Sequence, residues 1–275
     1  MSEYPVTLIR PTSGAPWARV AEAWHNRELL YFLTLRDVKV RYAQTILGWL
    51  WAIVQPIGMT LVFALAFSKV GDVSTEGVSY PVFALIGLTF WVFFQRAVTM
   101  AADSLVTNGP LLTKTSCPRL LMPISAVVSA LFDLAIGMVV MFVVVFAYGE
   151  DVTWRVALLP AITLWGVVLA AGIGILLSGI NVRHRDVRNG LPFALQLLLF
   201  LSPIAYSLGA LGNGGLTLIA FNPLVGLVEA FRWSVIGTPG PETFPLLWSI
   251  GVTVVLPFIA LMYFSRVARE FADVA

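Results

Sequence analysis

Charged side chains gather in residues 181–190, NVRHRDVRNG, between two long apolar runs. The stretch holds three arginines, a histidine and an aspartate. Its His184-Arg185-Asp186 tripeptide matches the HRD of protein-kinase catalytic loops, in which an asparagine five positions after the aspartate holds a metal ion. That position is Leu191 in this sequence. The spacing excludes a kinase loop and leaves a charged connection between apolar segments.

The sequence also lacks the sets of residues that other kinds of catalysis need. His25 and His184 lie far apart and outside the apolar runs, and the single cysteine, Cys117, can form neither an internal disulfide nor a metal cluster. No lysine follows a glycine, as the Walker A lysine must. We therefore expect no catalytic residue, metal or nucleotide site on this chain. If the protein uses ATP and Mg²⁺, another chain binds them.

Asp133 is the one carboxylate inside an apolar run. An ionised side chain within a bilayer is costly and usually faces a partner or water. We expect Asp133 to accept hydrogen bonds from a neighbouring helix or to line a polar route; a proton relay is the alternative.

The elements that carry these residues belong to a membrane protein. The chain is 59% hydrophobic and only 12% charged, and its mean hydropathy of +0.88 lies far above that of soluble domains. Apolar runs of roughly 20 residues predict helices that cross the bilayer. We expect an all-α fold with six transmembrane helices. They are predicted at residues 46–68, 80–100, 120–147, 156–180, 191–211 and 246–265.

Residues 216–237 are apolar but too interrupted for a seventh span. Asn222-Pro223 divides them, since proline removes a donor and disfavours helix at the preceding residue. Neither half approaches the roughly 20 residues that a span needs. We predict two short re-entrant helices before the last span.

Charge asymmetry supports six spans with both termini in the cytoplasm. This arrangement places 14 of the 17 basic residues on the cytoplasmic side and leaves Lys69, Arg155 and Arg232 on the other. A seventh span would move Arg266 and Arg269 outside and weaken the pattern.

The segments outside the spans are predicted to be two tails and one helix. Residues 1–28 lack the apolar region of a signal peptide and are expected to be a cytoplasmic tail, as are residues 266–275. Between the tails, residues 29–265 form one transmembrane domain. It starts with an amphipathic interface helix at 29–45, whose apolar stripe is expected to hold Tyr31, Leu35, Val38 and Tyr42. This helix either anchors the first span or acts as a gate.

In the fourth predicted span, four small residues recur at four-residue intervals. They are Gly166, Ala170, Gly174 and Ser178. Such a stripe permits close helix contact within the bundle.

Four stretches in this order resemble the permease subunits of type 2 ABC exporters, and more narrowly the polysaccharide exporters for O-antigen, capsule or teichoic acid chains. They are RDVKVRYAQTILGWLWAIVQP, KTSCPRLLMPIS, NVRHRDVRNGLPFALQLLLFLSPIAYS and FNPLVGLVEAFRW. The resemblance covers about residues 29–266. One departure is Cys117, where a bulky residue such as phenylalanine is typical.

The resemblance implies a bacterial inner-membrane protein that exports a lipid-linked polysaccharide, O-antigen first, with capsule or teichoic acid as the alternative. It also implies the partners: a second copy of the chain and two cytoplasmic ABC ATPase subunits that carry ATP and Mg²⁺. Membrane lipids are further partners, and nucleic acid is not. Two other classes stay open from the residues alone. An ion-coupled secondary transporter predicts several intramembrane ionisable groups, and a membrane glycosyl- or phosphotransferase predicts product formation by the chain alone.

Three sets of residues follow as candidates for this function. Aromatic rings suit the apolar faces of sugars, so the translocation path is predicted to involve Trp49, Trp51, Phe63, Phe67, Trp91, Phe94 and Tyr206. Gate or lipid-phosphate candidates are Arg36, Lys39, Arg41 and Tyr42. Coupling to the ATPase, through the connection at residues 101–119 and the charged stretch, is predicted to involve Asn108, Leu111, Lys114, Arg119, Arg183, Arg185 and Asp186. The alternatives are lipid-facing or core aromatics, and arginines that only mark topology or bind anionic lipid.

Overall fold

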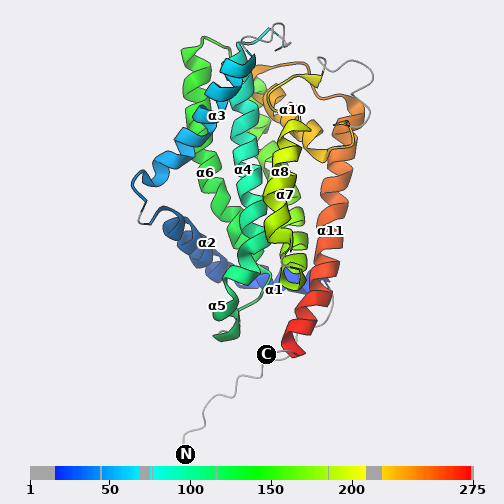
Figure 1. Cartoon of the computed structure of the whole chain (residues 1–275). Coiled ribbons are helices and arrows are strands. Elements are labelled where there is room, and N and C mark those ends of the chain that lie inside the picture. Colours follow the sequence, from blue (N-terminus) through cyan, green and yellow to red (C-terminus); the bar gives the residue numbers. More distant parts are fainter. Residues whose placement is uncertain are drawn as a thin grey trace, which may run out of the picture.

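The computed structural model describes residues 16–43, 45–67, 75, 77–114, 117–184, 186–208 and 219–273, and within them it holds helices and no strand. The helices stand side by side in a tall bundle (Figure 1). In chain order they are α1 (Pro16–His25), α2 (Arg27–Tyr42), the 3₁₀ helix η1 (Gly48–Leu50), α3 (Trp51–Phe67), α4 (Tyr80–Thr107), α5 (Gly109–Lys114), α6 (Leu121–Ala147), the 3₁₀ helix η2 (Trp154–Leu158), α7 (Leu159–Arg183), α8 (Asp186–Phe200), α10 (Pro223–Ile236) and α11 (Thr243–Asp273).

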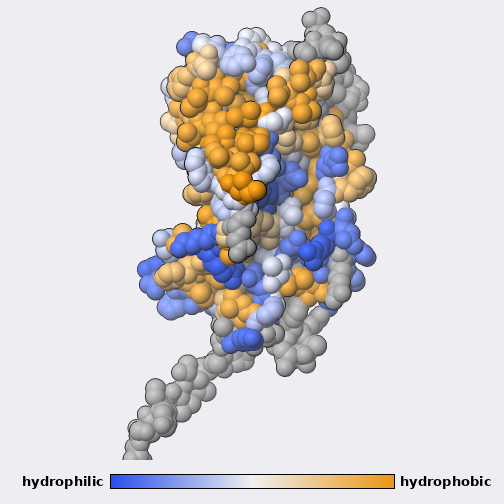
Figure 2. All heavy atoms as spheres, turned by 60° about the vertical axis from the view of Figure 1, so that its left-hand side comes forward, coloured by the Kyte–Doolittle hydropathy of each residue, from blue (hydrophilic) through white to orange (hydrophobic). Residues whose placement is uncertain are grey.

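Five helical segments among the described residues are long and apolar enough to cross a membrane. They are Gly48–Phe67, Tyr80–Thr107, Leu121–Ala147, Trp154–Arg183 and Thr243–Val267. Their positions overlap five of the six predicted spans. On the face shown in Figure 2, hydrophobic residues cover much of the upper part and hydrophilic residues gather lower down.

The boundary between α4 and the connection after it differs from the prediction. The connection was expected from Ala101, whereas α4 continues to Thr107. The bundle buries four residues of this extension, Ala101, Ala102, Ser104 and Leu105. Residues 101–108 contain no glycine or proline, and the first such pair is Gly109-Pro110. Packing and sequence therefore both allow two further helical turns.

The fifth predicted span, residues 191–211, is wrong as a continuous helix. The structure has α8 over Asp186–Phe200, 15 residues, followed by turns through residue 206. At 1.5 Å per residue this helix spans about 22 Å, less than the roughly 30 Å of a hydrocarbon core. Pro203 explains the end, because the residue before a proline is disfavoured in the α region.

Arg232 of α10 satisfies the backbone that this break leaves open. Its side chain is buried, at 2% exposure for the residue, and its Nη2 donates to the carbonyls of Pro203 and Ile204, both at 3.0 Å. Its guanidinium also lies 3.6 Å from the ring centroid of Phe83. Since no water reaches such carbonyls inside a membrane protein, they need a donor from the protein itself. Arg232 therefore has a structural role, whereas the sequence indicated only its place in the charge distribution across the membrane.

Only the second of the two short helices predicted in residues 216–237 falls wholly within the described residues. It is α10, a short helix as predicted, at the end of the bundle opposite α1, α2 and α5 (Figure 1). Asn222 caps it, accepting from the Leu224 N–H at 3.0 Å and donating to the Leu201 carbonyl at 3.1 Å. Gly237, with φ of 70°, ends it in the left-handed region. Residues 216–218 lie outside the described part.

The small-residue stripe of α7 is confirmed as a close contact. Gly166, Ala170, Gly174 and Ser178 are all buried. A Cβ at Gly174 would lie 2.5 Å from the Cβ of Ala101, and one at Gly166 would lie 2.6 Å from Cε2 of Phe90. The backbone of α7 therefore approaches α4 more closely than larger side chains would permit.

The N-terminal helices change one prediction, because residues 16–25, expected in the tail, form α1. Helix α2 covers most of the predicted interface helix. Tyr31 of the expected apolar stripe is 61% exposed, and the side of α2 that meets the bundle carries Leu33, Asp37 and Arg41. Polar partners on α6, which a hydropathy pattern does not register, decide this orientation.

The break at Pro203 generates a stability prediction. A Cβ at Gly87 of α4 would lie 2.6 Å from the Ile204 carbonyl oxygen and 3.0 Å from Nη2 of Arg232. Gly87→Ala should destabilise the protein by about 1–3 kcal/mol, the usual cost of overpacking, measured as a lower Tm in detergent. The matched control is Gly251→Ala in α11, where a Cβ meets nothing within 4 Å. Equal Tm values for the two variants would contradict this account.

Candidate functional site

Asp133, midway along α6, is the centre of a buried ionic cluster. Its side chain is 2% exposed. From α2 it accepts hydrogen bonds from Nη1 of Arg41 and the hydroxyl of Tyr42. From α4, Nη1 of Arg96 lies 2.9 Å from its Oδ2, and Nη2 of Arg96 donates to Gln55 of α3 at 2.7 Å. Two other helices thus meet at one carboxylate, and α3 joins them through Arg96.

Helix α2 lies along α6 through a polar ladder, which we define as Asp37 and Arg41 on α2 and Ser125, Ser129 and Asp133 on α6. The Ser125 hydroxyl donates to Asp37 at 3.1 Å, and Nη2 of Arg41 donates to the Ser129 hydroxyl at 2.7 Å. The ladder residues of each helix are four apart, which places them on one helical face. Sequence reasoning missed this match, although the four-residue spacing on α6 was a readable signal.

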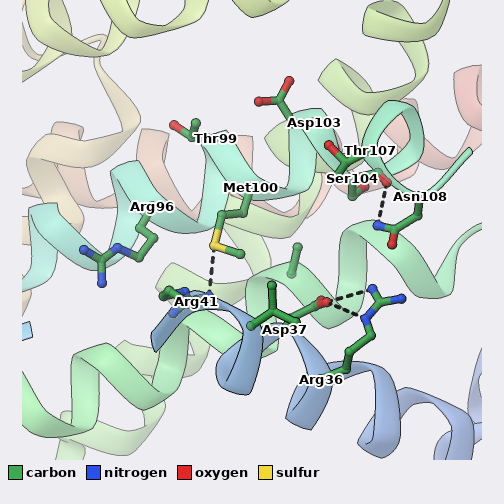
Figure 3. A pocket seen from close by; sticks show the side chains of 12 residues that line it. Arg36, Asp37, Arg41, Arg96, Thr99, Met100, Asp103, Ser104, Thr107 and Asn108 are labelled. Carbon is green, nitrogen blue, oxygen red and sulfur yellow. Dashed lines mark hydrogen bonds and ion pairs between the residues drawn. The ribbon is translucent and has the colours of Figure 1, made fainter. Parts of the chain in front are cut away.

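A cavity of about 640 Å³ lies beside the ladder, between α2, α4 and α6 (Figure 3). Its charged lining consists of Arg36, Asp37, Arg41, Arg96 and Asp103. Thr99, Met100, Ser104, Thr107 and Asn108 complete the α4 wall, with Val40 and Ala126 from the other helices.

Most charges around the cavity are paired within the protein. Arg36 contacts Asp37 at 2.8 Å, and Asp103 accepts from Nδ2 of Asn181 at 3.0 Å. Arg41 and Arg96 instead share Asp133. The lining carries three arginines and two carboxylates, and Asp133 adds a third carboxylate next to Arg41 and Arg96, so positive and negative charges balance around the cavity.

The gate candidates divide into three groups. Arg41 and Tyr42 meet at Asp133, and Arg36 and Arg41 line the cavity. Lys39 is exposed and is not among the cavity-lining residues. Arg96, which no sequence pattern singled out, joins the group from α4.

Two of the seven aromatic path candidates are corrected by the structure. Trp91 and Phe94 are each 1% exposed and pack in the core beside Phe90. Their helix, α4, lies at the centre of the bundle, where nearly every face is covered. These rings stabilise the fold and are not accessible to a substrate.

The other five aromatic candidates keep an accessible surface. Trp49 and Trp51 are 55% and 48% exposed. Phe63 stacks on Phe67, with ring centroids 6.1 Å apart, and further rings from α4 and α8 join them. The joining contacts are Phe67 to Tyr80 at 5.8 Å and Phe63 to Phe200 at 6.4 Å. Tyr206 donates its hydroxyl to the Phe200 carbonyl at 2.9 Å.

The coupling candidates lie near one end of the bundle. After α4, the predicted short helix is present as α5, and Asn108 donates to the Ser104 carbonyl at 2.8 Å. Buried Asn181, which sequence reasoning passed over, donates to the Ala102 carbonyl at 3.0 Å and so holds the end of α7 beside the end of α4. Among the candidates, Lys114, Arg183 and Asp186 are exposed and Leu111 and Arg119 half-buried. Arg185 lies outside the described residues.

Cys117 shows no sign of a chemical role. It is half-buried, and burial raises the pKa of its thiol above the usual range, which keeps it protonated and unreactive. Among the described residues no group of three or more histidine, cysteine or carboxylate side chains could hold a metal ion.

Comparison with known proteins identifies the family of the chain. Residues 28–236 match the family described as ABC-2 type transporter. The O-antigen export system permease protein RfbA of Myxococcus xanthus is 30% identical over 92% of this chain and 98% of its own length. A protein of the same name from Klebsiella pneumoniae is 27% identical over 90% of this chain and 95% of its own length.

A further similar protein is the polysialic acid transport protein KpsM of Escherichia coli, 27% identical over 85% of this chain and 92% of its own length. The family match covers most of the described bundle, from the start of α2 to the end of α10. The chain therefore belongs to the ABC-2 type transporter family.

Proposed function

We propose that the chain is the membrane subunit of an ATP-driven exporter that moves a lipid-linked polysaccharide, most directly an O-antigen, out of the cytoplasm. The observation that carries this proposal is similarity to O-antigen export permeases over nearly the whole of both chains. Similarity to a polysialic acid transporter keeps capsular polysaccharide as the second substrate class. The resemblance to teichoic acid exporters keeps that class as a further alternative.

The proposed topology has six crossings, with α8 as the fifth. Helix α8 follows directly on α7, whose Asn181 bonds Ala102 near the end of α4. It leads to residues beside the start of α4, where the Tyr80 hydroxyl donates to the Ala205 carbonyl at 3.0 Å. The segment thus covers the length of the bundle. The 15 residues of α8 are too short to do so alone, and the turns after Phe200 cover the remaining distance.

Six crossings place α1 and the end of α11 on one side, and Arg19 of α1 donates to the Ser265 carbonyl of α11 at 3.4 Å. The excess of basic residues assigns that side to the cytoplasm. Helix α2 then lies at the cytoplasmic membrane interface, and α10 is a re-entrant element at the outer side.

A bacterial inner-membrane complex of two such chains and two cytoplasmic ABC ATPase subunits is proposed. ATP and Mg²⁺ bind the ATPase, and α5 with Arg183, Arg185 and Asp186 contacts it. Helix α2 transmits the movement to the spans, since its polar ladder ties it to α6.

The path for the glycan is proposed along α3 and the end of α8. Trp49, Trp51, Phe63, Phe67 and Tyr206 lie there and retain accessible surface. Aromatic faces bind sugars without demanding one hydrogen-bond pattern.

An ion-coupled transporter is the less favoured function. Asp133 is the carboxylate that would have to carry the ion, yet two arginines and a tyrosine already occupy it. A carboxylate held in this way is a poor relay, because it must lose these partners to take up a proton.

Export by a complex of this chain and an ATPase subunit is tested by deleting this chain in its host. Lipid-linked glycan should then accumulate in the cytoplasm, and surface polysaccharide should be lost. Co-expression with an ABC ATPase subunit of the same host should give a complex with ATPase activity and restore export. Export that persists without that subunit would contradict the ABC mechanism, and glycan synthesis by the purified chain alone would favour a transferase.

Contact with the ATPase is tested by reversing an exposed charge. Asp186→Arg should lower recovery of the bound ATPase about tenfold, the effect of about 1.4 kcal/mol of lost interface energy. The control is Asp151→Arg, also exposed but in the connection between α6 and α7. Unchanged assembly and ATP turnover in Asp186→Arg would make the stretch at residues 181–190 a topological marker only.

The aromatic path is tested at Trp49. Trp49→Ala should slow export about fivefold while the ATPase stays bound, since one aromatic contact contributes about 1 kcal/mol. Glycan retained inside the cell is the measurement. Trp154→Ala, at a position 79% exposed in η2, should export normally. Normal export by both variants would remove Trp49 from the path.

A further inference from the structure

One face of α8 is exposed along the helix and carries amide and aromatic side chains in alternation. Asn189, Phe193, Gln196 and Phe200 follow one another at offsets of four, three and four residues, which places them on one side of the helix. All four are exposed, with Phe193 at 65% and Phe200 at 59%. The opposite face packs against the core of the bundle through four leucines, Leu191, Leu195, Leu198 and Leu199.

Gln196 is the most informative member of this face. It lies ten residues after Asp186, where α8 begins, and therefore about 15 Å along the helix at 1.5 Å per residue. In the proposed topology this distance is about half of a hydrocarbon core of roughly 30 Å. An amide at that depth needs hydrogen-bonding partners, because lipid tails offer none. Since the side chain is exposed, those partners come from outside the bundle.

The outer end of this face continues into the aromatic row of the proposed glycan path. The ring centroids of Phe200 and Phe63 are 6.4 Å apart, and Phe63 stacks on Phe67. Tyr206 donates its hydroxyl to the Phe200 carbonyl at 2.9 Å. Helices α3 and α8 both contact α4 and stand on either side of it (Figure 1). The exposed face of α8 thus extends the aromatic row towards the start of α8.

The side chains of this face have the chemistry of a carbohydrate-binding surface. Phenyl rings cover the apolar C–H faces of sugars, and amides donate and accept hydrogen bonds, as sugar hydroxyls do. Residues 189–200 contain no charged side chain, and neither do residues 46–68, the predicted first span. A polyanion would need cationic side chains along its route. Uncharged sugar units therefore fit this face better than charged ones.

We propose that the exposed face of α8 is a wall of the glycan path, on which Gln196 donates and accepts hydrogen bonds with uncharged sugar units of the polysaccharide. The inference rests on the proposed function and extends the path from the end of α8 along the whole helix. Consecutive side chains of the face are about 5 Å apart along the helix axis. A sugar that leaves one ring therefore meets an amide and then the next ring, so the chain can advance without one contact holding it.

Photocrosslinking in growing cells identifies what covers this face. p-Benzoylphenylalanine placed at Gln196 should give, on illumination, an adduct that carries polysaccharide and is absent in a host unable to synthesise the glycan. The matched control position is Val139 of α6, 65% exposed on another apolar helix, which should give no such adduct. An adduct with a second copy of this chain would overturn the path and make the face a contact between copies. Adducts with lipid alone, or none, would also overturn it.

The role of the amide is tested by two substitutions. Gln196→Leu roughly keeps the size of the side chain and should slow export about fivefold, since one or two hydrogen bonds to sugar are lost. Gln196→Asn keeps the amide and should retain most of the export. Recovery of the bound ATPase is measured for both variants to show that the complex assembles. Wild-type export rates in Gln196→Leu would overturn the role of Gln196, and the crosslink tests the path if that variant fails to assemble.

The charge of the sugar units is tested at the same position. For an uncharged polymer, Gln196→Lys and Gln196→Glu should slow export to a similar extent, because each adds a charge without a partner at membrane depth. Export that is fast in Gln196→Lys and slow in Gln196→Glu would show an anionic polymer and overturn this assignment.

The failure of this inference is distinguishable from the failure of the proposed function. Wild-type export without a polysaccharide adduct at Gln196 overturns the wall on α8 alone. Surface polysaccharide that persists when the chain is deleted overturns the proposed function.

Discussion

The ion pairs of the Asp133 carboxylate are the interactions on which the α2 end of the bundle depends. A charge midway along a candidate transmembrane helix requires partners from the protein, because hydrocarbon offers none. Arg41, Tyr42 and Arg96 supply them from α2 and α4. This requirement draws α2 against α6, and the serines four and eight residues before Asp133 set its position along the helix. The cavity beside them is a consequence of arginines that reach inward from both sides.

Buried polar groups at the opposite end of the bundle also need partners from the protein. There the carbonyl oxygens of Pro203 and Ile204 lack a helical donor because α8 ends before Pro203, and the buried guanidinium of Arg232 donates to both. Gly87 leaves the space in which this turn meets α4. Asn222 adds hydrogen bonds to Leu201 and Ser202. A short, broken helix is stable here because Arg232 and Asn222 donate to the carbonyls of Pro203, Ile204 and Leu201.

The two polar centres lie at opposite ends of the bundle. At one end Asp133 meets Arg41 and Arg96, and at the other Arg232 meets the carbonyls of Pro203 and Ile204. Each centre joins helices that are far apart in the sequence through charged groups shielded from solvent. The core aromatics Trp91 and Phe94, by contrast, pack α4 into the centre of the bundle.

Sequence alone determined the properties that each segment has by itself. Hydropathy located five spans, Asn222-Pro223 located the start of α10, and four small residues identified the contact face of α7, because lipid, proline and side-chain size act within one helix. Only the tertiary structure decided which face of α2 is buried, why Asp133 is tolerated, and that Trp91 and Phe94 are core residues. Each of these depends on side chains from segments far apart in the chain, such as Arg41 and Asp133, 92 residues apart. Hydropathy averages over a segment and carries no information on which residues meet across helices.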